Sequence, residues 1–167
     1  MILIGGGSRS GKSAAALRVL KASGTRLGFI ATAQAFDDEM RQRIAMHQAE
    51  RDGSIVTWEE PLDVAERIGA EDGGYDAIVV DCLTLWLSNI MLAEDRDVEC
   101  ECRKLVDAAA HAQTKVILVS NEVGCGIVPE NELARRFRDH AGRLNQRAAE
   151  QAAEVHWMIF GIGLRIK

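Results

Sequence analysis

The sequence predicts a three-layer α/β fold, in which helices flank a mostly parallel sheet. Short apolar segments alternate along the chain with segments of helical pattern, as they do when each strand is followed by a helix that returns over the sheet. Residues 75–81 form a nearly continuous apolar run, which is typical of a strand that is buried on both faces. A glycine-rich segment at 6–13 joins the first apolar run to the first helical one, as in many nucleotide-binding α/β proteins.

Composition favours one domain that spans residues 1–167. A chain of 167 residues with 47% hydrophobic and 27% charged side chains is long enough to bury a core of its own. The net charge of −5 disfavours nucleic acid as a partner. No membrane span is expected, and the first apolar run is too short for a signal peptide, so we expect a cytoplasmic location. The four cysteines complete no zinc-binding pattern and are expected to be free thiols.

The first half of the chain is expected to contribute alternating strands and helices. The expected strands are residues 1–4, 27–31 and 55–59. The expected helices are residues 14–20, 36–51 and 61–70. Asp37 is the expected N-cap of the second of these helices, because its side chain can accept a bond from the first backbone N–H groups. Pro61 suits the first turn of the third, where its missing N–H leaves no bond unmade.

The second half continues the same alternation. A turn is expected at 71–74, where two glycines follow two acidic residues. The expected strands are residues 75–81, 115–120 and 155–160, and the segment at 161–163 is expected to end the last of them. The expected helices are residues 83–91, 98–113 and 131–153.

Residues 6–13 fit the pattern G-x-x-x-x-G-K-[ST] of a phosphate-binding loop (P-loop). Its members are Gly6, Gly7, Ser8, Arg9, Ser10, Gly11, Lys12 and Ser13. The glycines let backbone N–H groups turn toward a polyphosphate, and the following helix adds its positive end. Lys12 would contact the β- and γ-phosphates and Ser13 a Mg²⁺ ion. A chance glycine-rich turn is disfavoured because the spacing, the strand before and the helix after all agree, so the loop predicts a nucleoside triphosphate.

Asp81 ends an apolar strand, as a second acidic element does in P-loop proteins. There it would hold Mg²⁺ opposite Ser13, directly or through water. The alternative is a carboxylate that caps the next helix. We favour the metal role.

His47 is a candidate for covalent chemistry. Within the expected helix 36–51, Met40, Ile44, His47 and Arg51 share one face, because they are spaced by four, three and four residues. An arginine one turn away suits an anionic phosphate. The alternative is an ordinary surface or partly buried histidine.

The segment after the strand 115–120 is expected to be a shaped loop. Asn121 and Glu122 would lie at the carboxyl end of that strand, near the nucleotide, and two glycines and Pro129 follow them. A plain turn is the alternative. The late helix is rich in arginine, at Arg135, Arg136, Arg138, Arg143 and Arg147. Such runs are usually solvated, or they reach a phosphate or a neighbouring subunit.

Together these motifs resemble one known family, the bifunctional adenosylcobinamide kinase/adenosylcobinamide-phosphate guanylyltransferases of cobalamin biosynthesis. The resemblance spans almost the whole chain. Its early motifs are residues 6–13, 31–33, 37–40, Arg43, Ile44, His47, Arg51 and 59–61. Its late motifs are residues 121–124, 126–129, 137–139, Gly142, Arg143, Asn145, Gln146 and 161–163.

The resemblance implies two reactions. The γ-phosphate of GTP or ATP passes to the hydroxyl of adenosylcobinamide. His47 then attacks the α-phosphate of GTP, and the GMP–histidine intermediate passes GMP to adenosylcobinamide phosphate. The implied nucleotide contacts are the P-loop, Thr32, Ala33, Gln34, Gln48, Ala49, Glu50, Arg51, Glu59 and Asp81. The resemblance also implies Mg²⁺, a RecA-like P-loop NTPase fold and a homotrimer.

The chain departs from the family pattern near its third strand. Ile55 stands where a tryptophan is expected, which affects the contacts expected from 51–59. Met46 stands where some relatives have a second histidine, and this leaves His47 as the one histidine of its helix. A P-loop kinase without nucleotidyl transfer is the main alternative function. A regulatory nucleotide switch is disfavoured because the sequence has no N-K-x-D guanine-recognition motif.

Overall fold

A seven-stranded sheet forms the centre of the computed structural model, which describes residues 1–34, 38, 41 and 53–167. The strand order is β3-β2-β4-β5-β1-β6-β7. All neighbouring strands pair in parallel except β7, which is antiparallel to β6. The strands are β1 (Ile2–Gly6), β2 (Leu27–Ala31), β3 (Ile55–Glu59), β4 (Ala77–Asp81), β5 (Lys115–Asn121), β6 (Glu154–Ile159) and β7 (Ile162–Arg165).

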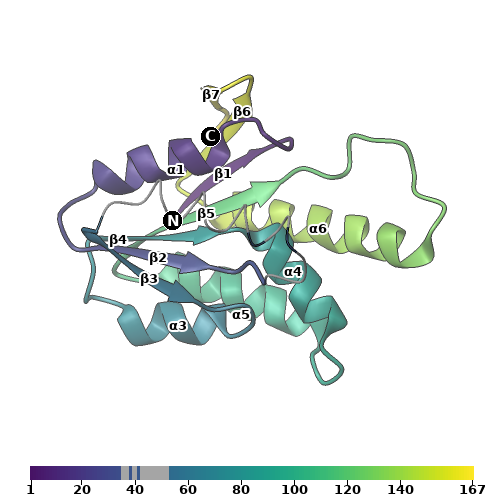
Figure 1. Cartoon of the computed structure of the whole chain (residues 1–167), viewed down its shortest axis with the longest axis horizontal. Helices are drawn as coiled ribbons and strands as arrows, with labels where there is room; N and C mark the ends of the chain where they lie inside the picture. The colour runs from purple at the N-terminus through teal and green to yellow at the C-terminus, as the bar shows by residue number, and fades with distance from the viewer. Residues whose placement is uncertain (35–37, 39–40, 42–52) are drawn as a thin grey trace.

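Helices cover both faces of this sheet (Figure 1). They are α1 (Lys12–Lys21), α3 (Val64–Glu71), α4 (Leu83–Leu92), α5 (Val98–His111) and α6 (Glu132–Gln151). The helix α1 packs on one face, whereas α3, α4, α5 and α6 pack on the other. The expected three-layer α/β class with a mostly parallel sheet is therefore confirmed, and β5 lies between the P-loop strand β1 and the acidic strand β4.

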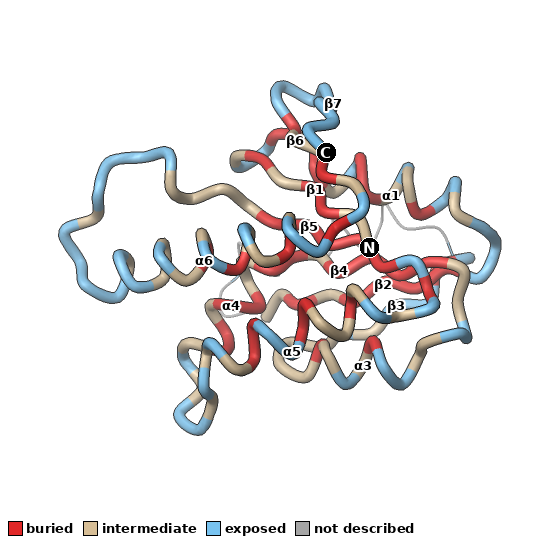
Figure 2. The backbone as a smooth tube through the Cα atoms, turned by 180° about the vertical axis from the view of Figure 1, so that it is seen from behind, coloured by how far each residue is buried: buried red, intermediate tan, exposed pale blue. Residues whose placement is uncertain are grey.

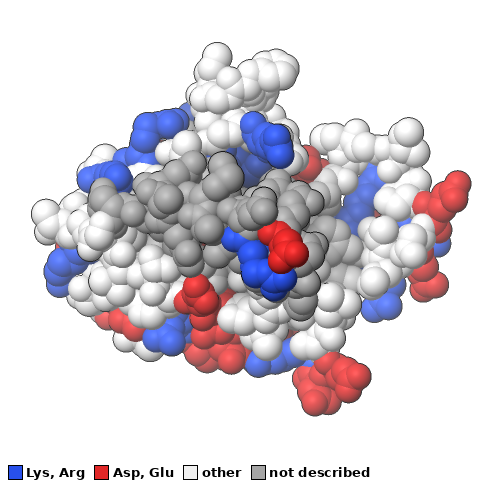
Figure 3. All heavy atoms as spheres, viewed as in Figure 1, with Lys and Arg blue, Asp and Glu red and all other residues white. Residues whose placement is uncertain are grey.

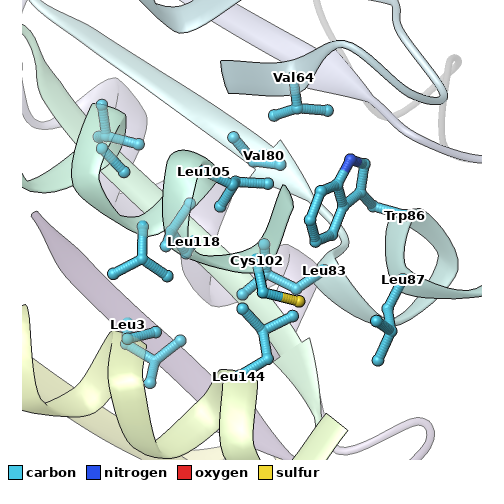
Figure 4. Close-up of a cluster of buried hydrophobic side chains, with 14 of the residues drawn as sticks. Leu3, Val64, Val80, Leu83, Trp86, Leu87, Cys102, Leu105, Leu118 and Leu144 are labelled. Carbon is cyan, nitrogen blue, oxygen red and sulfur yellow. The ribbon is translucent and has the colours of Figure 1, made fainter. Parts of the chain in front are cut away.

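The larger hydrophobic cluster lies between the sheet and the helices α3 to α6 (Figure 4). Leu3, Val80 and Leu118 reach it from three strands, and Trp86 enters from α4. Burying a side chain of this size stabilises the fold by about 1.5–3 kcal/mol relative to leaving it exposed. The indole N–H of Trp86 donates to the Leu62 carbonyl at 2.9 Å, so the polar end of this buried ring is satisfied.

The expectation that the strand at 155–160 is the last of the sheet is wrong. The chain turns back there and adds β7, with Ile159 paired to Ile162. Phe160 and Gly161 form the two-residue turn and have φ angles of 51° and 81°. Positive φ at both central residues is the geometry of a type I′ hairpin turn. Because a bulky residue rarely adopts positive φ, the sequence carries no turn signal at Phe160.

The helix expected at 61–70 begins later, at Val64. The Glu60 carboxylate accepts bonds from the backbone N–H groups of Leu62 and Asp63, at 3.2 and 2.9 Å. These bonds hold the residues after Pro61 in a turn instead of a first helical turn. The other described helices and strands agree with expectation to within two residues. The helix expected at 36–51 lies outside the described residues.

None of the helices in the described ranges combines the length and apolarity that crossing a membrane requires. Burial follows the three layers. Exposed residues lie on the β6–β7 hairpin, on the loops before α5 and α6 and on the outer helix faces (Figure 2).

Candidate functional site

The P-loop leaves the carboxyl end of β1 and enters α1 through three residues with positive φ, which are Gly6 (147°), Arg9 (56°) and Gly11 (94°). A Cβ atom on Gly6 would lie 2.6 Å from the Met158 carbonyl oxygen, so only glycine fits there. Gly11 is the N-cap of α1 and provides no side-chain cap. The first N–H groups of α1 therefore remain available to an anion.

Lys12 lies within this loop and is only 7% exposed. Its Nζ donates to the Gly7 carbonyl at 2.5 Å and to Ser10 Oγ at 3.4 Å, so the ammonium group is held over the turn. Burial lowers the pKa of Lys12, and the nearby charge of Asp81 acts in the opposite direction. The carboxylate of Asp81 is therefore close enough to the loop cation to influence its pKa.

Asp81 is the last residue of β4. It is in register with Val119 of β5, which is itself in register with Ile4 of β1. Two strand spacings, roughly 10 Å, therefore separate the backbone of Asp81 from that of β1. The N-cap of α4 is Cys82, so Asp81 does not occupy the capping position that was the alternative.

Ser13 and Asp81 supply a hydroxyl and a carboxylate, which are the oxygen ligands that Mg²⁺ prefers. Ser13 is the second residue of α1 and is partly exposed. The described part of the chain holds no group of three or more His, Cys, Asp or Glu side chains arranged for a metal. Two protein ligands beside phosphate oxygens are what Mg²⁺ sites at nucleotides usually contain, so the residues fit this ion.

Thr32 is fully buried and bonds to the backbone of the neighbouring strand end. Its hydroxyl donates to the Cys82 carbonyl and accepts from the Cys82 N–H, both at 2.8 Å. Its own carbonyl accepts a bond from Asn89 Nδ2 at 2.9 Å. Thr32 thus ties the end of β2 to the start of α4, and the half-buried Ala33 and Gln34 follow from this anchored point.

Three strand ends line up on the same edge of the sheet. Ala31 is in register with Glu59 on one side and with Asp81 on the other. Glu59 is exposed at the end of β3. The carboxyl edge of a parallel sheet is where ligands of such folds bind, so the structure brings Glu59, Asp81 and the segment after Ala31 to one edge with the P-loop.

The other predicted site residues cannot be placed. His47, Gln48, Ala49, Glu50 and Arg51 lie outside the described residues, together with Met40, Arg43 and Ile44. Their roles stay predictions.

The loop after β5 is fastened to α6 by side-chain hydrogen bonds, as expected of a shaped loop. Ser120 Oγ donates to Asn145 Oδ1 at 2.6 Å, and Asn145 Nδ2 donates to the Asn121 carbonyl at 3.2 Å. One guanidinium N–H of Arg138 reaches the Gly124 carbonyl at 2.6 Å. Asn145 and Arg138 are seven residues apart and therefore share one face of α6, and this spacing is visible in the sequence.

Two other arginines of α6 also have protein partners. Arg135 donates to the carbonyls of Pro129 and Glu130, and Arg147 pairs with Glu99. The loop and helix side chains therefore support one another. Over the described part of the face in Figure 3, basic and acidic side chains are interspersed.

The chain matches known proteins along its whole length. The family model described as cobinamide kinase / cobinamide phosphate guanyltransferase matches residues 2–166. "Bifunctional adenosylcobalamin biosynthesis protein CobP" of Pseudomonas aeruginosa is 43% identical over 99% of this chain and 96% of its own. The proteins named "Bifunctional adenosylcobalamin biosynthesis protein CobU" of Salmonella typhimurium and Escherichia coli are 41% and 38% identical, over 100% of this chain and 99% of theirs.

Among solved structures, a protein of Pyrococcus horikoshii OT3 is similar in fold, with a TM-score of 0.53 and 10% identity over 100% of this chain and 85% of that one. This likeness concerns the fold alone. The family model and the full-length relatives agree with the motifs that the structure brings together at the carboxyl edge of the sheet. The chain belongs to the cobinamide kinase / cobinamide phosphate guanyltransferase family.

Proposed function

We propose that this chain carries out two successive transfers to one corrinoid. It phosphorylates adenosylcobinamide with GTP or ATP, and it then transfers GMP from GTP to adenosylcobinamide phosphate, which gives adenosylcobinamide-GDP and pyrophosphate. The observation that carries the proposal is the P-loop with its buried Lys12, at the same edge of the sheet as Asp81, in a chain of this family.

In the kinase step, the acceptor hydroxyl oxygen bonds to the γ-phosphorus and loses its proton to solvent. The bond from the γ-phosphorus to the β–γ bridging oxygen breaks, and GDP or ADP leaves. Lys12 and the first N–H groups of α1 neutralise the charge on the β- and γ-phosphates. Phosphoryl transfer depends mainly on positioning and charge neutralisation, so a buried cation within the loop is the principal requirement. Ser13 and Asp81 would hold Mg²⁺, which supplies further neutralisation of phosphate charge when it is bound.

In the nucleotidyl step, a ring nitrogen of His47 bonds to the α-phosphorus of GTP, and the α–β bridging bond breaks to release pyrophosphate. A neutral imidazole is a good nucleophile near pH 7. An oxygen of adenosylcobinamide phosphate then bonds to the same phosphorus, the N–P bond breaks and His47 is regenerated. The same Lys12 that steadies the γ-phosphate in the first step would steady the departing pyrophosphate in the second.

The remaining nucleotide contacts follow the family pattern, and Glu59 and the segment after Ala31 lie at the sheet edge that such contacts require. Ala33, Gln34 and Glu59 would contact the nucleoside from the ends of β2 and β3, with Gln48, Ala49, Glu50 and Arg51 completing the set. Thr32 would act by holding the end of β2, since its hydroxyl is bonded to Cys82.

We also propose that three copies of the chain associate. Exposed apolar side chains lie in two separate places, at Ile162 and Leu164 of β7 and at Ile127 and Val128 before α6. Two different patches that meet between copies make a head-to-tail contact, and such a contact gives a ring of three when the rotation between copies closes after three steps. Light scattering should then give three times the chain mass. Because all four cysteines are free thiols, the cytoplasm is the compartment we assign.

The test is product analysis with adenosylcobinamide, GTP and Mg²⁺. Wild-type protein should form adenosylcobinamide-GDP and pyrophosphate, whereas His47→Ala should stop at adenosylcobinamide phosphate. His111→Ala is the matched control, because His111 is exposed on α5, and it should behave as wild type. Adenosylcobinamide phosphate as the final product of the wild type would show a kinase alone and would contradict the proposal.

A further inference from the structure

One aromatic side chain beside the P-loop has no role in the account so far. Phe160 is 96% exposed and sits in the β6–β7 turn with a φ of 51°. A bulky residue with positive φ is an outlier. Such strain persists where the surrounding structure imposes it, and it clusters at ligand sites. Phe160 combines a strained backbone with an exposed aromatic ring, and this combination indicates a ligand-binding position.

The turn that carries Phe160 is docked on the P-loop. The Gly161 N–H donates to the Ser10 carbonyl at 3.0 Å. A Cβ atom on Gly11 would lie 3.1 Å from the Gly161 Cα, so the two backbones are in direct contact. In Figure 1 the hairpin stands next to the passage from β1 into α1. Phe160 is therefore one residue away from the backbone that would hold the phosphates.

We propose that Phe160 is a stacking platform for the base of the triphosphate that the P-loop holds. This inference rests on the proposed use of that loop for a nucleoside triphosphate. With the phosphates fixed at the N-terminus of α1, the nucleoside leaves the loop toward a neighbouring element, and the Phe160–Gly161 turn touches the loop directly. A phenyl ring has no hydrogen-bonding group, so it accepts the face of guanine and of adenine alike.

The order of the strands separates this platform from the other predicted contacts. β6 and β7 lie on one side of β1, whereas β2 and β3 lie on the other. Glu59 at the end of β3 is four strand spacings from β1, roughly 20 Å. A base on Phe160 is therefore turned away from Glu59, and the two sides of the P-loop serve different poses of the nucleotide.

The experiment compares ligands with and without a base. Calorimetry would measure the binding of Mg-GTP, Mg-ATP and Mg-tripolyphosphate to the full chain. Phe160→Ala should weaken GTP and ATP about 5- to 100-fold, the range given by loss of one base–aromatic stack, and should leave tripolyphosphate unchanged. Phe160→Trp should bind both nucleotides with about the wild-type affinity, because an indole ring can also stack on a base. Ile159→Ala is the matched control, because Ile159 is an exposed apolar residue of the same hairpin with no proposed contact.

The other outcomes are distinct. Equal weakening of all three ligands by Phe160→Ala would mean that the turn only braces the loop, and unchanged nucleotide affinity would mean that the base lies elsewhere. A change of assembly mass with Phe160→Ala would place the ring in a contact between subunits. Each of these results overturns the inference while the proposed function stands. Failure of the wild type to bind any of the three ligands would overturn the proposed function as well.

Discussion

At the scale of single residues, Lys12 carries the strongest prediction. Its ammonium group is buried and held over the P-loop by Gly7 and Ser10. A hydrogen bond from a charged donor such as this ammonium group contributes about 1.5–3 kcal/mol. Lys12→Met removes the bond to the phosphates and should therefore weaken the binding of Mg-GTP about 10- to 100-fold. Calorimetry measures this directly. Lys104→Met, on α5 and half exposed, is the control and should bind as wild type; equal affinity of Lys12→Met would argue against a phosphate-binding role.

Asp76 carries a prediction about pH and stability. Backbone N–H groups of Arg26 and Thr25, and then the Arg26 guanidinium, lower the pKa of Asp76 to about 2. This value lies below that of an unfolded aspartate, about 3.9. The carboxylate therefore stabilises the fold above about pH 4, and this stabilisation is lost as the pH falls from about 4 toward 2.

Asp76→Asn should lower the free energy of unfolding at pH 7. The difference in this free energy between the variant and the wild type should shrink as the pH falls from 4 to 2. Urea denaturation across this range would measure both. Asp95→Asn, at an exposed position, should follow wild type throughout. A difference for Asp76→Asn that stays constant down to pH 2 would contradict the assignment.

The sequence predicts those site residues whose role can be recognised from their immediate neighbours along the chain. Lys12 and Asp81 could be predicted because a loop motif and the end of an apolar strand are visible in the chain itself. Thr32 could not be understood this way, since its bonds reach Cys82 and Asn89, about fifty residues along the chain. The role proposed for Phe160 is not visible in the sequence, because it depends on the contact of the neighbouring Gly161 with a loop about 150 residues earlier.

At the scale of elements, the attachment of the β5–α6 loop is the feature to test. Asn145 accepts from Ser120 and donates to the Asn121 carbonyl. Removing both bonds leaves partly buried polar groups without partners, which costs about 1–3 kcal/mol. Asn145→Ala should therefore lower the urea midpoint, whereas Gln146→Ala, at the exposed neighbouring position, should not. Equal urea midpoints for Asn145→Ala and the wild type would mean that the hydrogen bonds of Asn145 do not stabilise the fold.

The sequence predicts the elements that continue the alternation of strand and helix. It does not predict β7 or the late start of α3. The parallel strands and their helices follow from apolar periodicity. The antiparallel β7 does not, because its exposed residues show no alternation between a buried and a solvent face, and its turn uses a phenylalanine at positive φ. The late start of α3 depends on the Glu60 side chain capturing two N–H groups, which overrides the preference of Pro61 for a first helical turn.

At the scale of the whole molecule, two hydrophobic clusters share one sheet. Val80 and Val79 are neighbours in β4, yet they point into opposite clusters. Both clusters contain side chains of the same strands, so separating those strands would expose both clusters. The two faces of the molecule should therefore unfold in one transition. This supports the expectation of one domain over 1–167.

The measurement for this expectation is denaturation followed by two probes. Circular dichroism and tryptophan fluorescence should give coincident transitions, because Trp86 lies in one cluster and the helices of both faces contribute to the dichroism. Two separated transitions would show that the faces unfold independently and would contradict the single domain.

The central claim is that one chain performs both transfers, with His47 carrying GMP between them. Incubation with GTP labelled at the α- or the γ-phosphate tests it most directly. The account predicts that α-label stays on the wild-type protein, survives alkali, is lost in acid and is absent from His47→Ala. Retention of γ-label instead of α-label, or α-label on His47→Ala at the wild-type level, would contradict it.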